Sequence, residues 1–510
     1  MKKLPIGIQT FSKIREGNYY YVDKTKYAYE LITNYTYTFL ARPRRFGKSL
    51  FLDTLREIFE GNKKLFEGLY IYDKWNWNEK FPVIKISWSG DLKSLESIKG
   101  TAIDIFKQNQ KKLGVVCDNT KNPISCFRQL IETSYEKYKK PVVVLIDEYD
   151  KPILDNIENI EIALEAREFL RGLYSIMKDN DQYIKFVFLT GVSKFSRASI
   201  FSGLNMLTDI SLMPKFGNIC GITQIELKET FKDLLYDVNL NELKSWYNGY
   251  YFLDDKVYNP FDIILFFDSK QYKNYWFSSG NPSFLVKLLK QNKYFLPNFE
   301  DLKVDEKILD AFDIEKIDIE VLLFQAGYLT ITDVIKKRKQ TFYKLYFPNF
   351  EVKSSFSDFL IDYLIDDDQR VRHQDEIYEA LEKADLEKFI NAFKNIFANL
   401  PYTYLEHVKD YEGFYASVVY VYLLSLGLKL IAEDITNKGR IDLTVFIKNK
   451  IYIIEFKTIE NPARKCTALQ QIKEKKYYEK YKNKNKEIYL IGMCFSEKDK
   501  NIVKAEFERI

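Results

Sequence analysis

Short apolar runs alternate with amphipathic segments through the first 220 residues of the chain. The runs VVVLI and FVFLT are apolar almost throughout, as expected of strands that are covered on both faces. Between such runs, Phe51, Leu55, Ile58 and Phe59 recur at helical spacing, and Gly61 follows them as a helix end. This alternation is typical of an α/β domain with a largely parallel sheet. The predicted strands are 37–41, 83–88, 142–146 and 186–190, and the predicted helices are 50–60 and 162–177.

The apolar pattern changes beyond about residue 225. Strand-like runs thin out up to about residue 370, which predicts a mostly helical region with small strands near 328–331 and 343–347. The polar stretch IDDDQRVRHQD at 365–375 is the best candidate for a domain boundary. After it, the pattern predicts helices at 376–398 and 411–426, a β-hairpin, a lysine-rich helix and a strand at 487–494. We therefore predict three domains, which cover 1–225, 226–370 and 371–510.

Residues 41–52, ARPRRFGKSLFL, follow a predicted strand and begin a predicted helix, the context that a phosphate-binding loop requires. Backbone N–H groups at the helix start would wrap the phosphates of ATP, Lys48 would reach the β- and γ-oxygens, and Ser49 would bind Mg²⁺. The pattern departs from the usual one because Arg42 stands where a glycine is common. Taken alone, RPRRFGKS is equally well interpreted as a basic surface turn. The residues expected to contact the nucleotide here are Arg45, Phe46, Gly47, Lys48 and Ser49.

Two acids follow the apolar strand of PVVVLIDEYD, about a hundred residues after the loop. Polar groups at the carboxyl ends of parallel strands lie at the crevice where α/β proteins bind ligands. We expect Asp147 to hold Mg²⁺ and Glu148 to orient or deprotonate the attacking water. The alternative is that both acids only cap the following turn. In the next strand, IKFVFLTGVSKFSR, we expect Thr190 to sense the γ-phosphate and Arg197 to neutralise developing charge.

Residues 439–457, GRIDLTVFIKNKIYIIEFK, contain two apolar-rich strands around a turn at 448–450 and predict an antiparallel hairpin. Folding about Asn449 brings Asp442 within one or two residues of Glu455, and Lys457 shares a face with Glu455 because strand side chains alternate. An acid inside an apolar run is costly unless it binds a cation or is paired. The three side chains therefore predict metal-assisted phosphodiester hydrolysis, with Mg²⁺ held by Asp442, Glu455 and the carbonyl of Phe456. A salt-bridged edge hairpin is the alternative.

Two flanking helices extend this constellation. Glu412 begins the apolar helix YEGFYASVVYVYLL and is a further candidate ligand, and Gln471 in ALQQIKEKKYY is placed to orient water or a backbone phosphate. The lysines that follow, in KEKKYYEKYKNKNK at 473–486, would attract phosphates without regard to sequence. By themselves these lysines are equally expected on a solvated helix face.

Composition narrows the class of protein. The formal net charge of +5 on 510 residues is too small to imply a polyanionic partner by itself. The five cysteines have no CxxC pair, so we predict reduced thiols and a cytoplasmic location rather than a disulfide framework or a structural zinc site. No apolar run is long enough for a signal peptide or a membrane span, so no membrane partner is expected.

The motifs resemble a known prokaryotic family, AAA-ATPase-like proteins fused to a PD-(D/E)XK nuclease superfamily domain. The segments that carry the resemblance spread over nearly the whole chain: LPIGIQTFSKI, YYYVDKT, RPRRFGKSL, VVVLIDEYDKPI, LTGVSKFSRASIFSGLNML, WYNGYYF, LLFQAGYLTI, FPNFEV and GRIDLTVF…IYIIEFK…QIKEKKYY. The resemblance implies an α/β fold with an N-terminal P-loop ATPase domain, a mostly helical middle region and a C-terminal restriction-endonuclease-like domain. It also makes Arg42 a family trait. Ile441 replaces the proline of the nuclease name, a substitution that the family tolerates.

The resemblance also assigns expected roles to individual residues. It implies that Asp147 and Glu148 are the Walker B pair, and that the nuclease residues are Glu412, Asp442, Glu455, Lys457 and Gln471. The leading hypothesis is an ATP-binding and ATP-hydrolysing enzyme whose ATPase module gates or loads a Mg²⁺-dependent nuclease, with Mn²⁺ as a second metal candidate. DNA is the expected substrate ahead of RNA, and assembly into a homo-oligomer is left open. The alternative is a nucleotide-dependent switch that binds nucleic acid or protein partners without cleavage.

Overall fold

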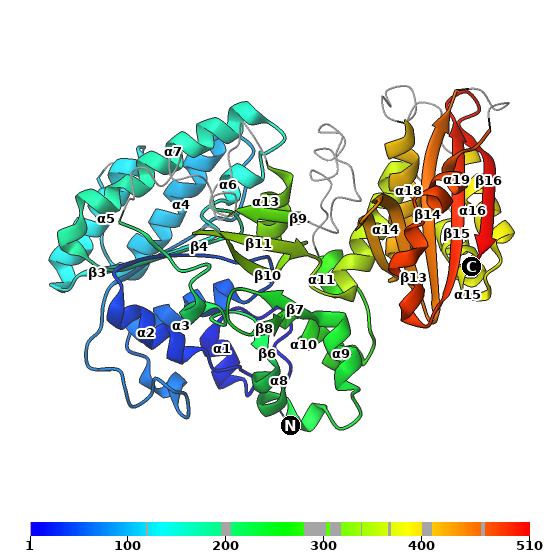
Figure 1. Ribbon diagram of the computed structural model, residues 1–510. Coiled ribbons are helices and arrows are strands. Elements are labelled where there is room, and N and C mark those ends of the chain that lie inside the picture. Colours follow the sequence, from blue (N-terminus) through cyan, green and yellow to red (C-terminus); the bar gives the residue numbers. More distant parts are fainter. Residues whose placement is uncertain are drawn as a thin grey trace. The chain divides into compact units, whose positions relative to one another are not determined.

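The computed structural model describes residues 2–118, 121–194, 206–279, 302–305, 318–337, 339–365, 369–399, 411–460 and 465–510. The chain forms two compact units (Figure 1). Unit 1 comprises residues 1–280 and 303–349, and unit 2 comprises 281–302 and 350–510. Most of the predicted middle segment 226–370 thus belongs to unit 1, and its parts 281–302 and 350–370 belong to unit 2. The division into three domains stays a prediction.

Unit 1 is built on a parallel five-stranded sheet of order β2-β3-β4-β1-β5. The strands are β1 (Tyr37–Ala41), β2 (Val83–Ser87), β3 (Val142–Asp147), β4 (Ile184–Gly191) and β5 (Thr208–Asp209). All six residues of β3 are buried, because helices cover both faces of the sheet. Figure 1 shows α1 (Phe11–Glu16), α2 (Thr25–Asn34) and α3 (Lys48–Phe59) on one side and α4 (Leu95–Leu113), α5 (Pro123–Tyr138) and α7 (Ile160–Asp179) on the other. The four predicted strands are therefore its four longer members, and the α/β fold class is confirmed.

The remainder of unit 1 combines helices with two small sheets, of order β6-β8-β7 and β10-β11-β9. The helices here are α6 (Lys151–Leu154), α8 (Gln224–Thr230), α9 (Leu240–Tyr247), α10 (Pro260–Ser269), α11 (Tyr275–Ser278) and α13 (Ile319–Ala326). The strands are β6 (Ile222–Thr223), β7 (Asn248–Tyr251), β8 (Lys256–Tyr258), β9 (Leu302–Asp305), β10 (Thr330–Lys337) and β11 (Gln340–Tyr346). The predicted small strands near 328–331 and 343–347 correspond to β10 and β11. The WYNGY segment supplies β7, where Gly249 has a φ of 138° and a Cβ would lie 1.8 Å from the carbonyl oxygen of Pro348.

The YYYVDKT segment ties the start of the chain to distant parts of unit 1. Asp23 accepts hydrogen bonds from the backbone N–H groups of Thr25 and Tyr70, both at 2.8 Å. Lys24 is 8% exposed and donates to the carboxylate of Glu226 at 2.6 and 2.8 Å and to the carbonyl of Asn218 at 2.8 Å. A buried lysine is stable only with such partners. The motif is therefore structural within unit 1.

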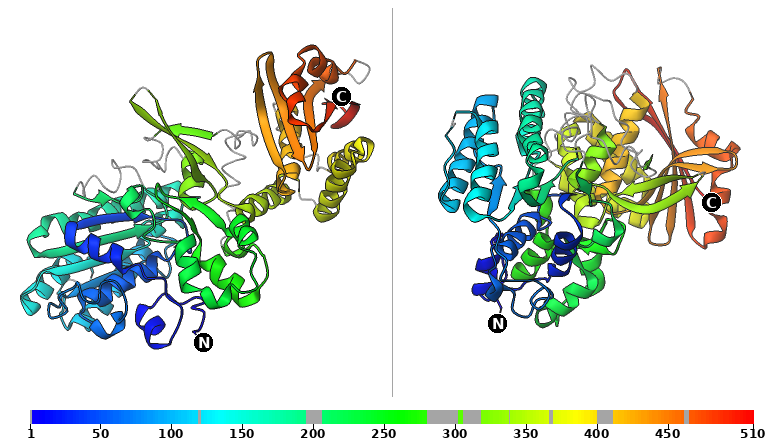
Figure 2. Two further views of the ribbon diagram at one scale, coloured as in Figure 1. Left: turned by 60° about the horizontal axis from the view of Figure 1, so that its bottom comes forward. Right: turned by 90° about the vertical axis from the view of Figure 1, so that its left-hand side faces the viewer.

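Unit 2 is a five-stranded mixed sheet of order β12-β13-β14-β15-β16, in which only β14 and β15 run parallel. Figure 2 shows the sheet edge-on and helices packed against it. Its strands are β12 (Lys429–Thr436), β13 (Gly439–Ile447), β14 (Lys450–Ile459), β15 (Glu487–Ser496) and β16 (Asn501–Arg509). The described helices are α14 (Phe350–Ile365), α15 (Arg370–Lys383), α16 (Leu386–Ala398), α18 (Tyr411–Ser425) and α19 (Ala468–Glu474). The predicted hairpin is β13 and β14.

The prediction of a lysine-rich helix is wrong in extent. α19 ends at Glu474, and the lysine stretch continues as short 3-10 turns at 477–480 and 482–484. Tyr477 and Tyr481 pack into the apolar core beside the sheet, which fixes the stretch there irrespective of helix propensity. Lys480 and the hydroxyl of Tyr481 both contact the buried carboxylate of Asp434. Part of the positive charge is thus already paired within unit 2.

The prediction of reduced thiols is wrong for four of the five cysteines. Disulfides join Cys117 to Cys126 and Cys466 to Cys494, and Cys220 is buried and free. The pairs lie 9 and 28 residues apart in the sequence, and tertiary packing rather than a local motif brings them together. Among the described residues, no helix is long and apolar enough to cross a membrane. A cytoplasmic location stays a prediction.

Candidate functional sites

The loop between β1 and α3 exposes the start of a helix. β1 ends at Ala41, α3 begins at Lys48, and Gly47 caps the helix with a φ of 90°. This conformation is costly for a residue with a Cβ, so the last loop position favours glycine. Nothing lies within 4 Å of the place where a Cβ would stand on Gly47, so this side of the loop is open. The unpaired N–H groups and the positive dipole end of α3 are therefore accessible to an anion.

Lys48 is folded back over the loop. Its ammonium donates to the backbone carbonyls of Arg42 at 2.8 Å and Pro43 at 2.9 Å, and the side chain is 7% exposed. Burial lowers the pKa of Lys48, and the carboxylate of Asp147 opposes that shift. A phosphate beside the loop would give this ammonium a full negative charge in place of two neutral carbonyls.

Arg42 has a structural role in the loop. Its guanidinium is 1% exposed, and its carbon lies 3.9 Å from the ring centroid of Phe252. Burial lowers the pKa of Arg42 to about 10. The guanidinium also donates, over 2.7 to 3.3 Å, to the backbone carbonyls of Ala41, Ser211, Phe216 and Gly217. Arg42 therefore binds the first residue of the loop to the segment 211–217.

A second contact holds the loop from the side of α13. Gly327, which follows α13, has a φ of 94°, and a Cβ there would lie 2.6 Å from the Cβ of Pro43. The indole N–H of Trp276 donates to the carbonyl of Arg44 at 3.1 Å. The glycine of the LLFQAGYLTI motif is thus required by a close approach to the phosphate loop.

Gly327→Val should destabilise the protein and weaken ATP binding together. The left-handed backbone costs roughly 1–2 kcal/mol, and displacement of Pro43 adds about 1–3 kcal/mol. Gly68 has a φ of 76° and nothing within 4 Å, so Gly68→Val is the matched control for the backbone cost alone. Denaturant unfolding and ATP titration measure both effects. Equal stability and equal ATP affinity in the two variants would show that the loop does not depend on this contact.

The acids predicted at the strand ends lie together. Thr190 on β4 donates its hydroxyl to Asp147 at the end of β3, at 2.6 Å, and both side chains are buried. Glu148 has a φ of 52°, and its side chain lines a cavity with the phosphate loop. Burial, and then the charge of Asp147, raise the pKa of Glu148. Arg197 lies outside the described residues.

Asp150 is a buried acid of this site that the sequence analysis did not single out. Its carboxylate accepts the backbone N–H groups of Val192 at 2.9 Å and Ser193 at 2.6 Å, which joins the loops after β3 and β4. Burial raises the pKa of Asp150 to about 6. The only sequence sign was a third acid in IDEYD, a weak signal because acids are common in turns.

The cavity beside the loop measures about 530 Å³, a size suited to a nucleotide-like ligand. One end is formed by residues 44–50 with Glu148 and Asp150. The other end is formed by the N-terminal segment 5–9 and by α10, where Phe261 lies 4.9 Å from the guanidinium carbon of Arg45. The segment LPIGIQ has no motif of charged residues, so its place in the wall of this cavity could not be predicted from the sequence. Phe46, by contrast, packs inward on Tyr250 with ring centroids 4.7 Å apart, so only its backbone faces the site.

In unit 2, two carboxylates meet at the predicted hairpin. Leu443 pairs with Ile454, which sets Asp442 beside Glu455 across the ladder. Asp442 accepts the backbone N–H of Phe456 at 2.8 Å. Burial raises the pKa of Asp442 to about 6, and burial followed by the charge of Asp442 raises the pKa of Glu455 to about 7. Two ionised groups here would repel each other in a medium of low polarity.

Glu455 is the central group of this site. Its side chain is fully buried, and one oxygen accepts from the amide of Gln471 and lies 3.4 Å from the ammonium of Lys457. The other oxygen has no hydrogen-bond partner among the described residues. Burial lowers the pKa of Lys457, but the neighbouring carboxylates outweigh it and the pKa is raised. Glu412 lies at the edge, with one oxygen 4.0 Å from Lys457 and the other accepting the N–H of Thr458 at 3.0 Å.

A glycine allows α19 to complete the site. A Cβ on Gly492 of β15 would lie 2.3 Å from the backbone nitrogen of Leu469, so α19 rests directly on the sheet at this point. Gly492 pairs with Glu455 in the sheet register. The close approach therefore places Gln471, two residues further along α19, over Glu455.

The donors at this site suit a hard divalent cation. A buried carboxylate oxygen without a partner, beside a second carboxylate with a raised pKa, is stabilised by a positive charge. Oxygen donors alone are typical of Mg²⁺ or Mn²⁺ sites rather than zinc sites. Within the described residues, however, no group of three or more His, Cys, Asp or Glu side chains forms a metal site. Main-chain carbonyl oxygen, substrate oxygens and water would have to complete the coordination.

Comparison with known proteins agrees with this geometry. Residues 5–201 match the family described as predicted AAA-ATPase, and residues 410–505 match the PD-(D/E)XK nuclease superfamily. The chain is also 44% identical, over 508 residues, to an uncharacterized protein encoded in the vnfD 5′ region of Azotobacter chroococcum mcd 1, with 98% of each chain covered. The first match spans the phosphate loop and the strand-end acids, and the second spans the carboxylate hairpin. The chain therefore belongs to the family of AAA-ATPase-like proteins fused to a PD-(D/E)XK nuclease superfamily domain.

Proposed function

We propose that the protein binds and hydrolyses ATP in unit 1 and cleaves phosphodiester bonds of nucleic acid, DNA in preference to RNA, in unit 2. The observation that carries the proposal is Glu455, a fully buried carboxylate with one oxygen lacking a partner, next to Asp442 and Lys457. A module that only binds nucleic acid has no use for such an arrangement, which costs free energy in the absence of a cation.

In unit 1, the chain's own groups have separate tasks. The N–H groups at the start of α3 bind the phosphates, and Lys48 leaves the loop carbonyls to contact the β- and γ-oxygens. Mg²⁺, when bound through Ser49 and Asp147, neutralises phosphate charge. Glu148 orients the attacking water and accepts its proton, while Thr190 holds the carboxylate of Asp147 in place. The apolar end of the cavity, formed by 5–9 and α10, receives the base.

In unit 2, Asp442 and Glu455 would hold Mg²⁺, or Mn²⁺ in its place, which would supply polarisation of the scissile phosphate and a more acidic bound water. Lys457 projects beside Glu455 and stabilises negative charge that develops on the phosphate oxygens. Gln471 fixes the orientation of Glu455. After Asp442 and Glu455, Glu412 adds to the negative charge that raises the pKa of Lys457, and it accepts the N–H of Thr458.

Substrate attraction and control complete the proposal. The side chains of Lys475, Lys476, Lys482 and Lys484, in the stretch that follows Gln471, are exposed and supply attraction to a phosphate backbone that does not depend on sequence. We propose that ATP binding or turnover gates or loads the nuclease, and that the protein works in the cytoplasm.

Mg²⁺ should stabilise the wild-type protein more at pH 8 than at pH 6. The pKa of Glu455 rises from its ordinary 4.5 to about 7, so without metal the folded state loses stability as the pH rises through this interval. Above this pH interval the carboxylates of Asp442 and Glu455 are both ionised, so the metal no longer competes with protons for them. Thermal unfolding of the wild type with and without Mg²⁺ measures the shift, and the same measurement in Asp147→Asn excludes a contribution from the metal ligand of the nucleotide site. The same shift in Glu455→Gln, or a larger shift at pH 6, would contradict the metal site.

A further inference from the structure

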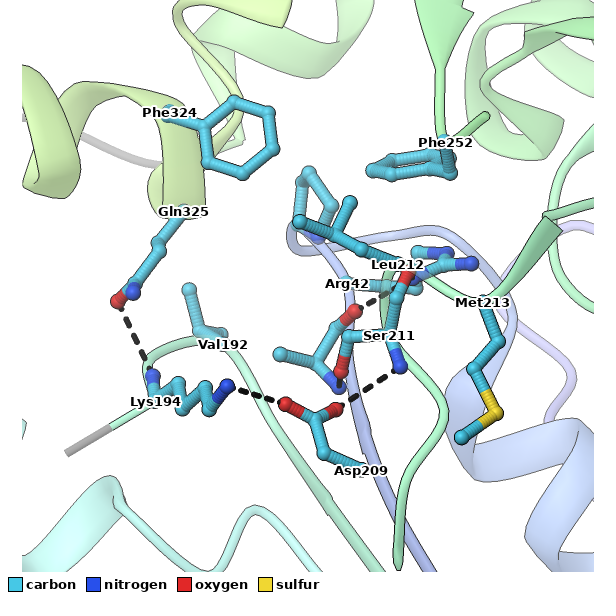
Figure 3. Close-up of a pocket in the computed structure, with 12 residues that line it drawn as sticks. Arg42, Val192, Lys194, Asp209, Ser211, Leu212, Met213, Phe252, Phe324 and Gln325 are labelled. Carbon is cyan, nitrogen blue, oxygen red and sulfur yellow. Dashed lines mark hydrogen bonds and ion pairs between the residues drawn. The ribbon is translucent and has the colours of Figure 1, made fainter. Parts of the chain in front are cut away.

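A second, smaller cavity lies behind the phosphate loop in unit 1. It measures about 200 Å³ and is enclosed by the tips of β1, β4 and β5, the residue after β7 and the end of α13. Figure 3 shows the rings of Phe324 and Phe252 along one side and the ion pair of Lys194 and Asp209 along the opposite side. Typical cavities for drug-sized ligands measure roughly 300–1,000 Å³, so this one suits a ligand smaller than a nucleotide.

Two polar side chains that line this cavity are incompletely bonded, Gln325 at its amide nitrogen and Arg42 at its Nε. Gln325 is 6% exposed, and its side-chain oxygen accepts the backbone N–H of Lys194 at 3.0 Å (Figure 3). That bond fixes which end of the amide is the nitrogen, because only the oxygen accepts a hydrogen bond. The amide nitrogen is buried and has no partner within the part of the chain that the structure describes. A buried donor without an acceptor costs about 1–3 kcal/mol, so a ligand that supplies an acceptor is favoured.

The charged groups restrict the ligand further. Asp209 is paired with Lys194 and accepts the N–H of Ser211 at 2.9 Å. Arg42 is bonded to backbone carbonyls and stacked on Phe252, with only its Nε lacking an acceptor. An anion would meet the carboxylate of Asp209, and a cation would meet Arg42 and Lys194. The walls therefore suit a neutral ligand.

We propose that this cavity binds a nucleobase, free or as a nucleoside, through the Gln325 amide and the apolar ring-lined wall. A flat ring with carbonyl or ring-nitrogen acceptors satisfies the unpaired amide donor, and aromatic and apolar side chains are the usual surfaces for bases. Phe252 and Phe324 supply such surfaces, and Pro43 links the cavity to the phosphate loop. A base bound here contacts Pro43, whose carbonyl accepts a hydrogen bond from Lys48. Binding of the base is therefore coupled to binding of the nucleotide.

The test is a calorimetric titration of the full-length protein with adenosine, guanosine, cytidine and uridine, with saturating ADP and Mg²⁺ present to fill the larger cavity. Gln325→Glu keeps the acceptor for Lys194 and removes the free donor, and Leu212→Trp fills the space. At least one nucleoside should bind the wild type, and both variants should weaken that binding by about tenfold or more. Gln340→Glu, at an exposed strand position, is the matched control and should bind like the wild type.

Three results would overturn the proposal. These are no binding of any nucleoside, equal binding in both variants, or binding of inorganic phosphate with the same dependence on Gln325. Circular dichroism checks that each variant folds, and Leu212→Trp decides the question if Gln325→Glu does not. A repeat without ADP separates this proposal from the ATPase assignment. If ADP does not bind, only the ATPase assignment fails, and the nucleoside titration still tests this cavity.

Discussion

Glu455→Gln is expected to abolish metal-dependent cleavage of nucleic acid while ATP binding stays unchanged. The substitution keeps the size of the side chain and its contact with Gln471, but it removes the negative charge beside Asp442. Loss of a group that stabilises the transition state electrostatically costs on the order of 10²–10³-fold in rate, and loss of a metal ligand should exceed that. Cleavage of a fluorescent DNA substrate in Mg²⁺ measures the effect.

The matched control is Glu506→Gln on β16, at an exposed position whose partner in the sheet register is Gly492. It changes the same charge on the same sheet without touching the site, so cleavage should match the wild type. Lys457→Ala should behave like Glu455→Gln in cleavage. Retention of wild-type cleavage in Glu455→Gln would exclude this hairpin as the catalytic site.

Lys48→Ala is expected to reduce ATP turnover on the order of 10³-fold. Among the described residues, the ammonium of Lys48 is the only cation of the loop that donates to the loop's own carbonyls, those of Arg42 and Pro43. It is therefore placed to exchange these carbonyls for phosphate oxygens. Asp147→Asn should have a comparable effect on turnover, since it removes the charge that Thr190 orients. Release of inorganic phosphate and binding of a fluorescent ATP analogue measure turnover and affinity separately.

Lys64→Ala, an exposed lysine after α3, is the control for the loss of one positive charge. It should leave turnover unchanged. If both Lys48→Ala and Asp147→Asn turn over ATP like the wild type, the phosphate-loop assignment fails, whatever the outcome in unit 2.

The predictable parts of the fold are those in which the local pattern of apolar residues directly reflects how the element packs in the folded chain. β3 and β4 are apolar on both faces because helices cover both, so their strands were visible as unbroken apolar runs. The hairpin of β13 and β14 was predictable because its turn separates two such runs. Its register then placed Asp442 beside Glu455 without further information.

Other features of the fold and of the sites depend on contacts between distant segments, which no local sequence pattern predicts. The segment 5–9 and α10 line the ATP-sized cavity together, although they lie more than 250 residues apart in sequence. The lysine stretch after α19 is not helical, because Tyr477 and Tyr481 pack in the core and hold it there. Asp150 and the four paired cysteines gain their partners only through the fold. Each requires knowledge of which distant elements pack together.

The central claim is that one chain carries two separate phosphate chemistries. It is tested most directly by one cleavage assay across single- and double-stranded DNA and RNA, in which ATP and Mg²⁺ are varied independently for the wild type and Glu455→Gln. We expect Mg²⁺-dependent degradation of DNA by the wild type and none by Glu455→Gln, although both proteins bind ATP. Wild-type protein that binds ATP but cuts no polynucleotide with Mg²⁺ or Mn²⁺ would contradict it.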